Sequence, residues 1–151
     1  METILFCAVI VMLLKIAYLD YRYHYIADLD ILLGTVPALA LQTLRHTWFN
    51  GLVGLILGGA CASLVYFFAK WKYDYAAFGS GDVTLFLFLG SIVGEQGFGE
   101  WTVFFSLLFL LCLVPLHLAK KLSWTKAFPL APFLNLATLF WLCSRLILGR
   151  L

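Results

Sequence analysis

Two aspartates, Asp20 and Asp82, stand where apolar stretches end, and an ionisable side chain in that position is a candidate for function. Asp20 follows the apolar run 3–19, and Asp82 precedes the run 83–94. Two neighbouring carboxyl groups share a proton, because both cannot ionise cheaply. One can then deprotonate a water molecule while the other donates a hydrogen bond to a carbonyl oxygen. The two aspartates are therefore candidates for acid–base chemistry on water.

Glycines surround the approach to Asp82, which follows Gly79-Ser80-Gly81. Glycine adopts a positive φ readily and allows another segment to approach closely. We therefore expect Gly79 and Gly81 to shape the backbone here and to leave room for an extended substrate. Two alternatives remain open. Asp82 could be an ordinary helix N-cap, and both aspartates could be solvated carboxylates at a membrane boundary.

The helix ends suggest a role for each carboxylate. Asp82 is expected at a helix N-terminus, whose dipole favours an anion, and Asp20 at a helix C-terminus, which disfavours one. This predicts Asp82 as the base and Asp20 as the acid. Asp28 and Asp30 begin the next apolar stretch and are predicted to be N-terminal caps.

The composition places the chain in a membrane. Of its 151 residues, 64% are hydrophobic and only 12% are charged, and its mean hydropathy is +0.99. These values lie outside the range of soluble globular domains. The net charge of +2 and the absence of a basic cluster do not indicate a nucleic-acid partner.

Apolar runs of near-spanning length recur along the chain. They cover 3–19, 29–44, 51–69, 83–94, 102–119 and 128–148. The sequence therefore predicts an all-α integral membrane protein in which about six transmembrane helices form one bundle and one domain, residues 1–151.

The distribution of lysine and arginine predicts the orientation of this bundle. If all six runs cross, the segments 20–28, 70–81 and 120–127 share one face and contain six of these residues, against three on the opposite face. The positive-inside rule then places the first face in the cytoplasm. Asp20 and Asp82 are expected at the same membrane depth on that side, with both termini outside.

Other residues are expected to have structural roles. Glycine pairs spaced by four residues favour close helix packing, as at Gly54/Gly58 and Gly90/Gly94. Asn135 is expected to form an interhelical hydrogen bond. Tryptophans at predicted helix boundaries are expected to anchor the membrane surface: Trp48, Trp71, Trp101 and Trp124. Single cysteines inside apolar runs are expected in the core: Cys7, Cys61, Cys112 and Cys143. Since neither cysteine nor histidine shows metal-ligand spacing, no metal or cofactor is predicted.

Three motifs carry a family resemblance. Gly79-Ser80-Gly81-Asp82 resembles the GxGD signature of bacterial type IV prepilin peptidases and archaeal preflagellin peptidases. The segment 20–28, in which Ile26 follows Asp20 by six residues, is similar to the second motif of that family, although Ala27 replaces the usual proline. The segment 129–133, PLAPF, resembles the opening of the family's last helix. Thr84 departs from the lysine of many members.

The resemblance implies a function. Members of this family are membrane aspartyl endopeptidases that remove a short basic leader from pilin-like precursors with a hydrophobic N-terminal helix. Asp20 and Asp82 would be catalytic, without a cofactor, at the cytoplasmic face of the inner membrane. Long members also methylate the product through a domain with paired CxxC motifs, and this sequence has none, so the short form is implied. A small cation-coupled transporter and a structural subunit of a pilus or secretion assembly are the alternatives.

Overall fold

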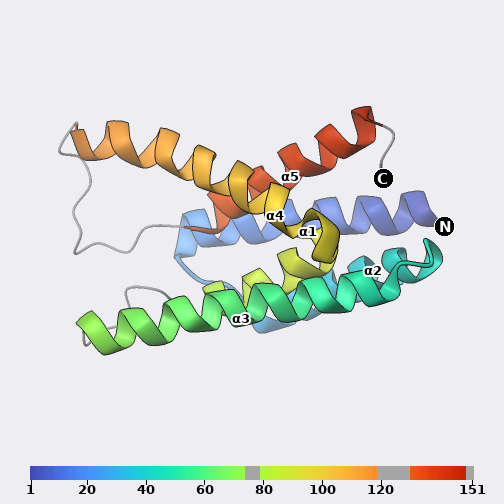
Figure 1. The fold of residues 1–151 in the computed structure, drawn as a ribbon, viewed down its shortest axis with the longest axis horizontal. Helices are drawn as coiled ribbons and strands as arrows, with labels where there is room; N and C mark the ends of the chain where they lie inside the picture. The colour runs from blue at the N-terminus through green and yellow to red at the C-terminus, as the bar shows by residue number, and fades with distance from the viewer. Residues whose placement is uncertain (74–78, 119–129, 149–151) are drawn as a thin grey trace.

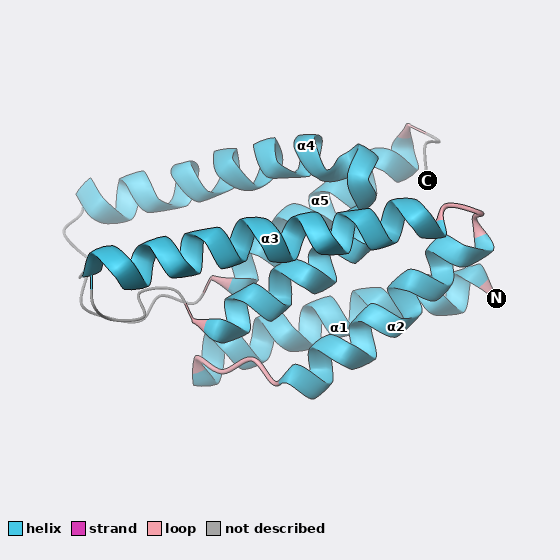
Figure 2. Ribbon diagram, turned by 60° about the horizontal axis from the view of Figure 1, so that its bottom comes forward, coloured by secondary structure: helices cyan, strands magenta, loops and turns pink. Residues whose placement is uncertain are grey.

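The computed structural model describes residues 1–73, 79–118 and 130–148, and in this part every regular element is a helix (Figure 1). Figure 2 shows that short loops join those helices whose connections are described. The helices are α1 (Glu2–Tyr23), α2 (Asp28–Leu44), α3 (Trp48–Tyr73), α4 (Ser80–Leu118) and α5 (Ala131–Ile147). The all-helical fold class is therefore confirmed for the described residues.

Helix α4 is interrupted at Gly94, whose φ of 70° is a left-handed conformation that glycine tolerates. Figure 1 shows that the two halves of α4 run in opposite directions from this point. Side chains from neighbouring helices bind the backbone groups that the break exposes. Asn50 Oδ1 accepts the Gln96 N–H at 3.0 Å, and Gln42 Nε2 donates to the Ile92 carbonyl at 3.2 Å. The two halves of α4 match the fourth and fifth predicted apolar runs.

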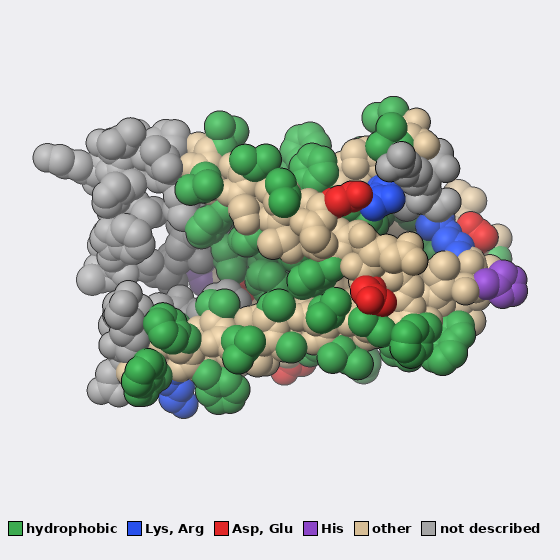
Figure 3. Space-filling view, in the orientation of Figure 1, with side chains coloured by type: hydrophobic (Ala, Val, Ile, Leu, Met, Phe, Trp, Pro, Cys, Tyr) green, Lys and Arg blue, Asp and Glu red, His purple; other side chains and the backbone are tan. Residues whose placement is uncertain are grey.

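Two of the described helical segments are long and apolar enough to cross a bilayer, Glu2–Tyr23 and Trp48–Trp71. Their outward side chains are apolar as well. On α3, for example, Leu64, Phe67 and Trp71 are 71%, 66% and 83% exposed. On the face drawn in Figure 3, hydrophobic side chains cover much of the helices, and the few charged side chains lie mostly in the right half of the view. The apolar helices therefore indicate a membrane protein, while six crossings stay a prediction.

The predicted burial of the cysteines is wrong at three positions. Cys7, Cys61 and Cys143 are exposed, and the side chain of Cys112 lies outside the described part. In a soluble protein an apolar neighbourhood indicates the core. In a helix bundle that faces lipid, apolar residues cover the outer surface too, so the type of residue does not tell which way it points.

The interior is a cluster of apolar side chains from α1, α2, α4 and α5. Trp101 belongs to this cluster, at 1% exposure, and its indole N–H donates to Thr138 Oγ1 at 2.8 Å. The predicted membrane-surface role is therefore wrong for Trp101, because a polar partner on α5 satisfies its N–H inside the bundle. Trp48 and Trp71 are exposed as predicted, and Trp124 lies outside the described residues.

Glycines allow α3 and α4 to pack closely, as the spacing of the glycine pairs predicted. A Cβ atom added to Gly54 would meet the carbonyl oxygen of Gly90, and one added to Gly90 would meet the carbonyl oxygen of Gly54. One turn further along α3, a Cβ atom on Gly58 would meet the carbonyl oxygen of Phe86. The two backbones are thus in direct contact, and this contact fixes where the first half of α4 lies.

The bundle brings the predicted site to one end. Figure 1 shows that α1 ends there, and that α2, α4 and α5 begin there. Helix α1 packs on α2 and α5, and α4 packs on α2, α3 and α5. Among the described residues the backbones of α1 and α4 do not come close, and the two helices meet only through side chains of the apolar cluster. At the opposite end Glu2 pairs with Arg45, and Glu100 with Arg145. Membrane orientation stays a prediction, since Lys120, Lys121 and Lys126 lie outside the described residues.

Candidate active site

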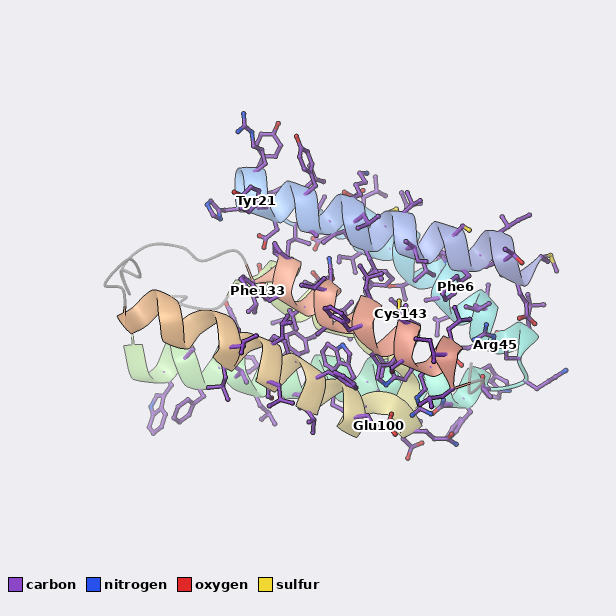
Figure 4. All side chains as sticks on the ribbon, turned by 90° about the horizontal axis from the view of Figure 1, so that it is seen from above. Phe6, Tyr21, Arg45, Glu100, Phe133 and Cys143 are labelled. Carbon is purple, nitrogen blue, oxygen red and sulfur yellow. The ribbon has the colours of Figure 1, made fainter. Side chains whose placement is uncertain are left out.

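Asp20 lies in the last turn of α1 and is buried, at 7% exposure. Its Oδ2 atom accepts the backbone N–H of Ala131 at 2.9 Å. Ala131 is the first residue of α5, so the N-terminal end of that helix faces the carboxylate. In Figure 4, Tyr21 and Phe133 mark this end of the bundle, while Arg45 and Glu100 lie toward the other end. Helix α5 therefore provides Asp20 with a hydrogen bond and a favourable dipole.

Asp82 lies in the first turn of α4. Its Oδ2 atom accepts the Gly79 N–H at 3.0 Å, and its own N–H donates to the Gly79 carbonyl at 3.1 Å. This reciprocal pattern resembles one half of a capping box. The helix begins at Ser80, so Asp82 is not the N-cap residue as the alternative proposed, but its carboxylate binds the N–H of Gly79 just before the helix. Asp82 therefore has a local structural role in addition to its proximity to Asp20.

The two glycines before Asp82 differ in their surroundings. Gly81 lies inside the first helical turn, and a Cβ atom there would lie 3.2 Å from Cβ of Ile26. A Cβ atom on Gly79 would meet only Asp82 Oδ2 at 3.5 Å and the Gly81 nitrogen at 3.9 Å. Gly81 thus permits close packing of the chain before α2, and Gly79 leaves space beside the carboxylate.

The two carboxylates are close enough to interact. Burial raises the pKa of Asp82 to about 6, the Gly79 N–H opposes this rise, and the negative charge of Asp20 adds to it. The fold therefore brings together the two aspartates that lie 62 positions apart in the sequence. An acid with this pKa keeps its proton below about pH 6 and in a minor fraction of molecules at pH 7, and in that form it can donate a hydrogen bond to a reacting carbonyl.

The predicted division of roles, with Asp20 as the acid and Asp82 as the base, stays a prediction. It considered only the helix that carries each aspartate, and it made Asp20 the acid. In the structure burial raises the pKa of both carboxyls. At Asp20 the N–H of Ala131, which begins a second helix, opposes the rise, as the charge of His24 does. The sequence could not reveal this, because Ala131 is 111 residues from Asp20.

The predicted caps of α2 are wrong. The N-cap is Ala27, without a side-chain hydrogen bond, because the helix begins at Asp28 itself. Asp28 is exposed, and its Oδ1 atom lies 3.5 Å from Thr84 Oγ1 on α4. Asp30 is buried and pairs with Lys15, whose Nζ lies 2.6 Å from Asp30 Oδ1. The sequence reading missed Lys15, a single cation inside an apolar run.

Some of the predicted features fall on residues that the structure does not describe, among them Pro129 of the third motif. Asn135 is described, and its Nδ2 donates to the Leu13 carbonyl at 2.8 Å, as predicted for an interhelical bond. Among the described residues, no group of three His, Cys, Asp or Glu side chains could hold a metal ion.

We expect the charge of Asp82 to reduce stability above pH 6. Since its pKa is about 6 in the folded chain and about 3.8 ordinarily, the folded state binds the proton more tightly. The free energy of unfolding should therefore fall as pH rises from about 4 to about 6, by at most about 3 kcal/mol and by less after solvent screening. Asp82→Asn should reduce this fall, leaving the part due to Asp20, whose pKa burial also raises, and be the more stable protein at pH 7 to 8.

Thermal unfolding in detergent at several pH values measures this effect. Asp28→Asn is the matched control, because that carboxylate is also in a first helical turn but is exposed. An unchanged pH dependence in Asp82→Asn would contradict the assignment of this proton to Asp82.

The sequence is similar to a protein of Haemophilus influenzae named prepilin leader peptidase/N-methyltransferase. The resemblance is to a prepilin peptidase. The two are 30% identical over 138 residues, which cover 85% of this chain. The chain spans 55% of the length of that relative. No family model and no solved structure matches the chain. The similarity supports a relationship to prepilin peptidases and suggests a peptidase activity.

Proposed function

We propose that the protein is a membrane-embedded aspartyl endopeptidase that removes a short basic leader from prepilin-like precursors. The observation that carries this proposal is the neighbouring pair of Asp20 and Asp82 at one end of an apolar helix bundle. The similarity to a prepilin leader peptidase adds support. In this proposal residues 1–151 form one peptidase domain in the inner membrane, with the aspartates toward the cytoplasm.

The surroundings of the pair favour a division of roles. Asp20, which accepts the Ala131 N–H, is the base that takes a proton from water. Asp82 holds a proton and donates it in a hydrogen bond to the scissile carbonyl oxygen. The water oxygen then bonds to the carbonyl carbon while Asp82 transfers its proton to the carbonyl oxygen, which gives a tetrahedral diol. Asp20 next passes the proton taken from water to the peptide nitrogen, and Asp82 takes back a proton from one diol hydroxyl. The C–N bond breaks, which releases the new amine and the carboxylic acid of the leader.

The position of the pair suits a substrate that enters from the membrane. A precursor with a hydrophobic N-terminal helix would place its leader junction at the bundle end that carries Asp20 and Asp82. There the substrate must leave helical structure before water can reach the carbonyl. The open space at Gly79 lies beside Asp82 and would accept an extended backbone.

The test is cleavage by the purified protein in liposomes that contain a prepilin-like precursor. The expected product begins at the hydrophobic helix and lacks the basic leader, which mass spectrometry of the product determines. A precursor whose junction glycine is replaced by a bulky residue serves as the control. If the well-folded protein leaves several unaltered prepilin-like precursors intact, the peptidase proposal fails. The transporter and structural-subunit alternatives would then be preferred.

A further inference from the structure

An ion pair on α1 has no part in the chemistry proposed above. Lys15 Nζ and Asp30 Oδ1 are 2.6 Å apart, and the side chains are 49% and 8% exposed. Burying a charge in an apolar bundle is costly unless the charge is paired. The pair therefore joins α1 to the first turn of α2 at one defined position on each helix.

The position of Lys15 on α1 determines which way Asp20 points. They are five positions apart, so at 3.6 residues per turn they lie about 140° apart around the helix axis. When Lys15 faces α2, Asp20 faces α5 and accepts the Ala131 N–H. Much of the outer surface of α1 is apolar, as at Ile4, Val11 and Leu14, and apolar side chains facing lipid do little to fix rotation about the axis.

The distance between the two catalytic candidates depends on this rotation. Among the described residues the backbones of α1 and α4 do not approach each other closely, although side chains of both belong to the apolar cluster, so α2 and α5 contribute much to their relation. On the α2 side, Asp30 binds Lys15, and Ile26, just before the helix, touches Gly81 beside Asp82. A continuous set of contacts thus runs from α1 through α2 to the start of α4.

We propose that Lys15 and Asp30 are positioning residues that hold α1 in the rotation at which Asp20 faces Asp82. The inference rests on the proposed peptidase function for its kinetic consequence. Its structural content, the rotation of α1, stands apart from any reaction. Without the ion pair, Asp30 is an unpaired carboxylate in an apolar setting. Helix α1 then keeps its buried apolar face and its hydrogen bonds to α5, and we expect it to turn enough to misplace Asp20.

The kinetic test compares Lys15→Met, Asp30→Asn and the exchanged pair Lys15→Asp/Asp30→Lys. Each single variant should lower kcat by about tenfold to a hundredfold with little change in KM, because misplacing a reacting group by about 1 Å has an effect of this size. The exchanged pair should regain most of the loss. Lys70→Met is the matched control, since Lys70 is exposed and has no ion pair among the described residues. A normal kcat in Lys15→Met would overturn the proposal.

A second measurement does not require activity. Leu13 and Asn135 meet on the face of α1 that carries Asp20, so Leu13→Cys/Asn135→Cys in a cysteine-free background should form a disulfide in membranes. Adding Lys15→Met should reduce its yield severalfold, and adding Lys70→Met should not. An equal yield with and without Lys15 would overturn the proposal. Should no precursor be cleaved while the yield still depends on Lys15, the peptidase function fails and the positioning role stands.

Discussion

Replacing either Asp20 or Asp82 with asparagine is expected to reduce leader removal by about a thousandfold or more. If the two carboxylates act on one water, neither alone can both accept its proton and polarise the carbonyl. Groups that act as a unit are strongly non-additive, so the double variant should be scarcely slower than either single one. The pair has two apparent pKa values, and we expect the higher one near the pKa of about 6 of Asp82. Wild-type activity should also decline as the pH rises above that value.

Initial cleavage rates in liposomes test this expectation, after the inserted amount of each variant has been matched. Insertion should persist, because asparagine keeps the shape and removes only a charge that an apolar environment disfavours. Asp28→Asn controls for the loss of a carboxylate at the same end of the bundle. A near-normal rate in either inserted single variant would return Asp20 and Asp82 to the role of solvated or capping residues.

Substituting the glycines between α3 and α4 is expected to have the largest effect on folding. A methyl group on Gly54 or Gly90 would meet a backbone carbonyl of the facing helix, and no change of rotamer can relieve that contact. Overpacking usually costs about 1 to 3 kcal/mol and more where backbones must separate. Gly90→Ala should therefore lower the thermal midpoint clearly, and Gly90→Leu should prevent accumulation of folded protein.

Gly99 provides a matched control in the same helix, because nothing lies within 4 Å of a Cβ atom added there. Gly99→Ala should be neutral or slightly stabilising, since alanine favours helix by about 1 kcal/mol over glycine. Thermal unfolding in detergent compares the variants. Equal midpoints for Gly90→Ala and Gly99→Ala would show that the α3–α4 contact is looser than described. Since this contact locates α4, a tolerated but shifted variant should also lose cleavage.

The helical fold could be predicted because it depends on local patterns. Apolar runs separated by polar residues correspond to the described helices, and the fourth run ends at Gly94, where α4 breaks. Glycine spacing predicted the α3–α4 contact for the same reason. Side-chain direction could not be predicted in this way. Cys61 stands inside an apolar run yet faces outward, whereas Trp101 stands at a predicted helix boundary yet faces inward, and only the packing of neighbouring helices decides.

The candidate site was predictable only in part. Asp20 and Asp82 stood out by residue type and by position at the ends of apolar runs. Their partners come from distant parts of the chain, and no local pattern indicates them. The Ala131 N–H is 111 residues from Asp20, and the Lys15–Asp30 pair joins residues in two different apolar runs. The electrostatic surroundings of these side chains therefore become visible only once the three-dimensional arrangement of α1, α2 and α5 is known.

The break at Gly94 makes the first half of α4 short. From Ser80 to Val93 the helix rises only about 20 Å, whereas the hydrocarbon core of a typical bilayer is about 30 Å thick. A segment of this length that crosses would thin the lipid around it or draw its ends below the headgroups. Asp82 stands at one of those ends. Water and phospholipid headgroups would then reach deeper beside this carboxylate than elsewhere, and acyl-chain length would become a variable that sets the hydration of the site.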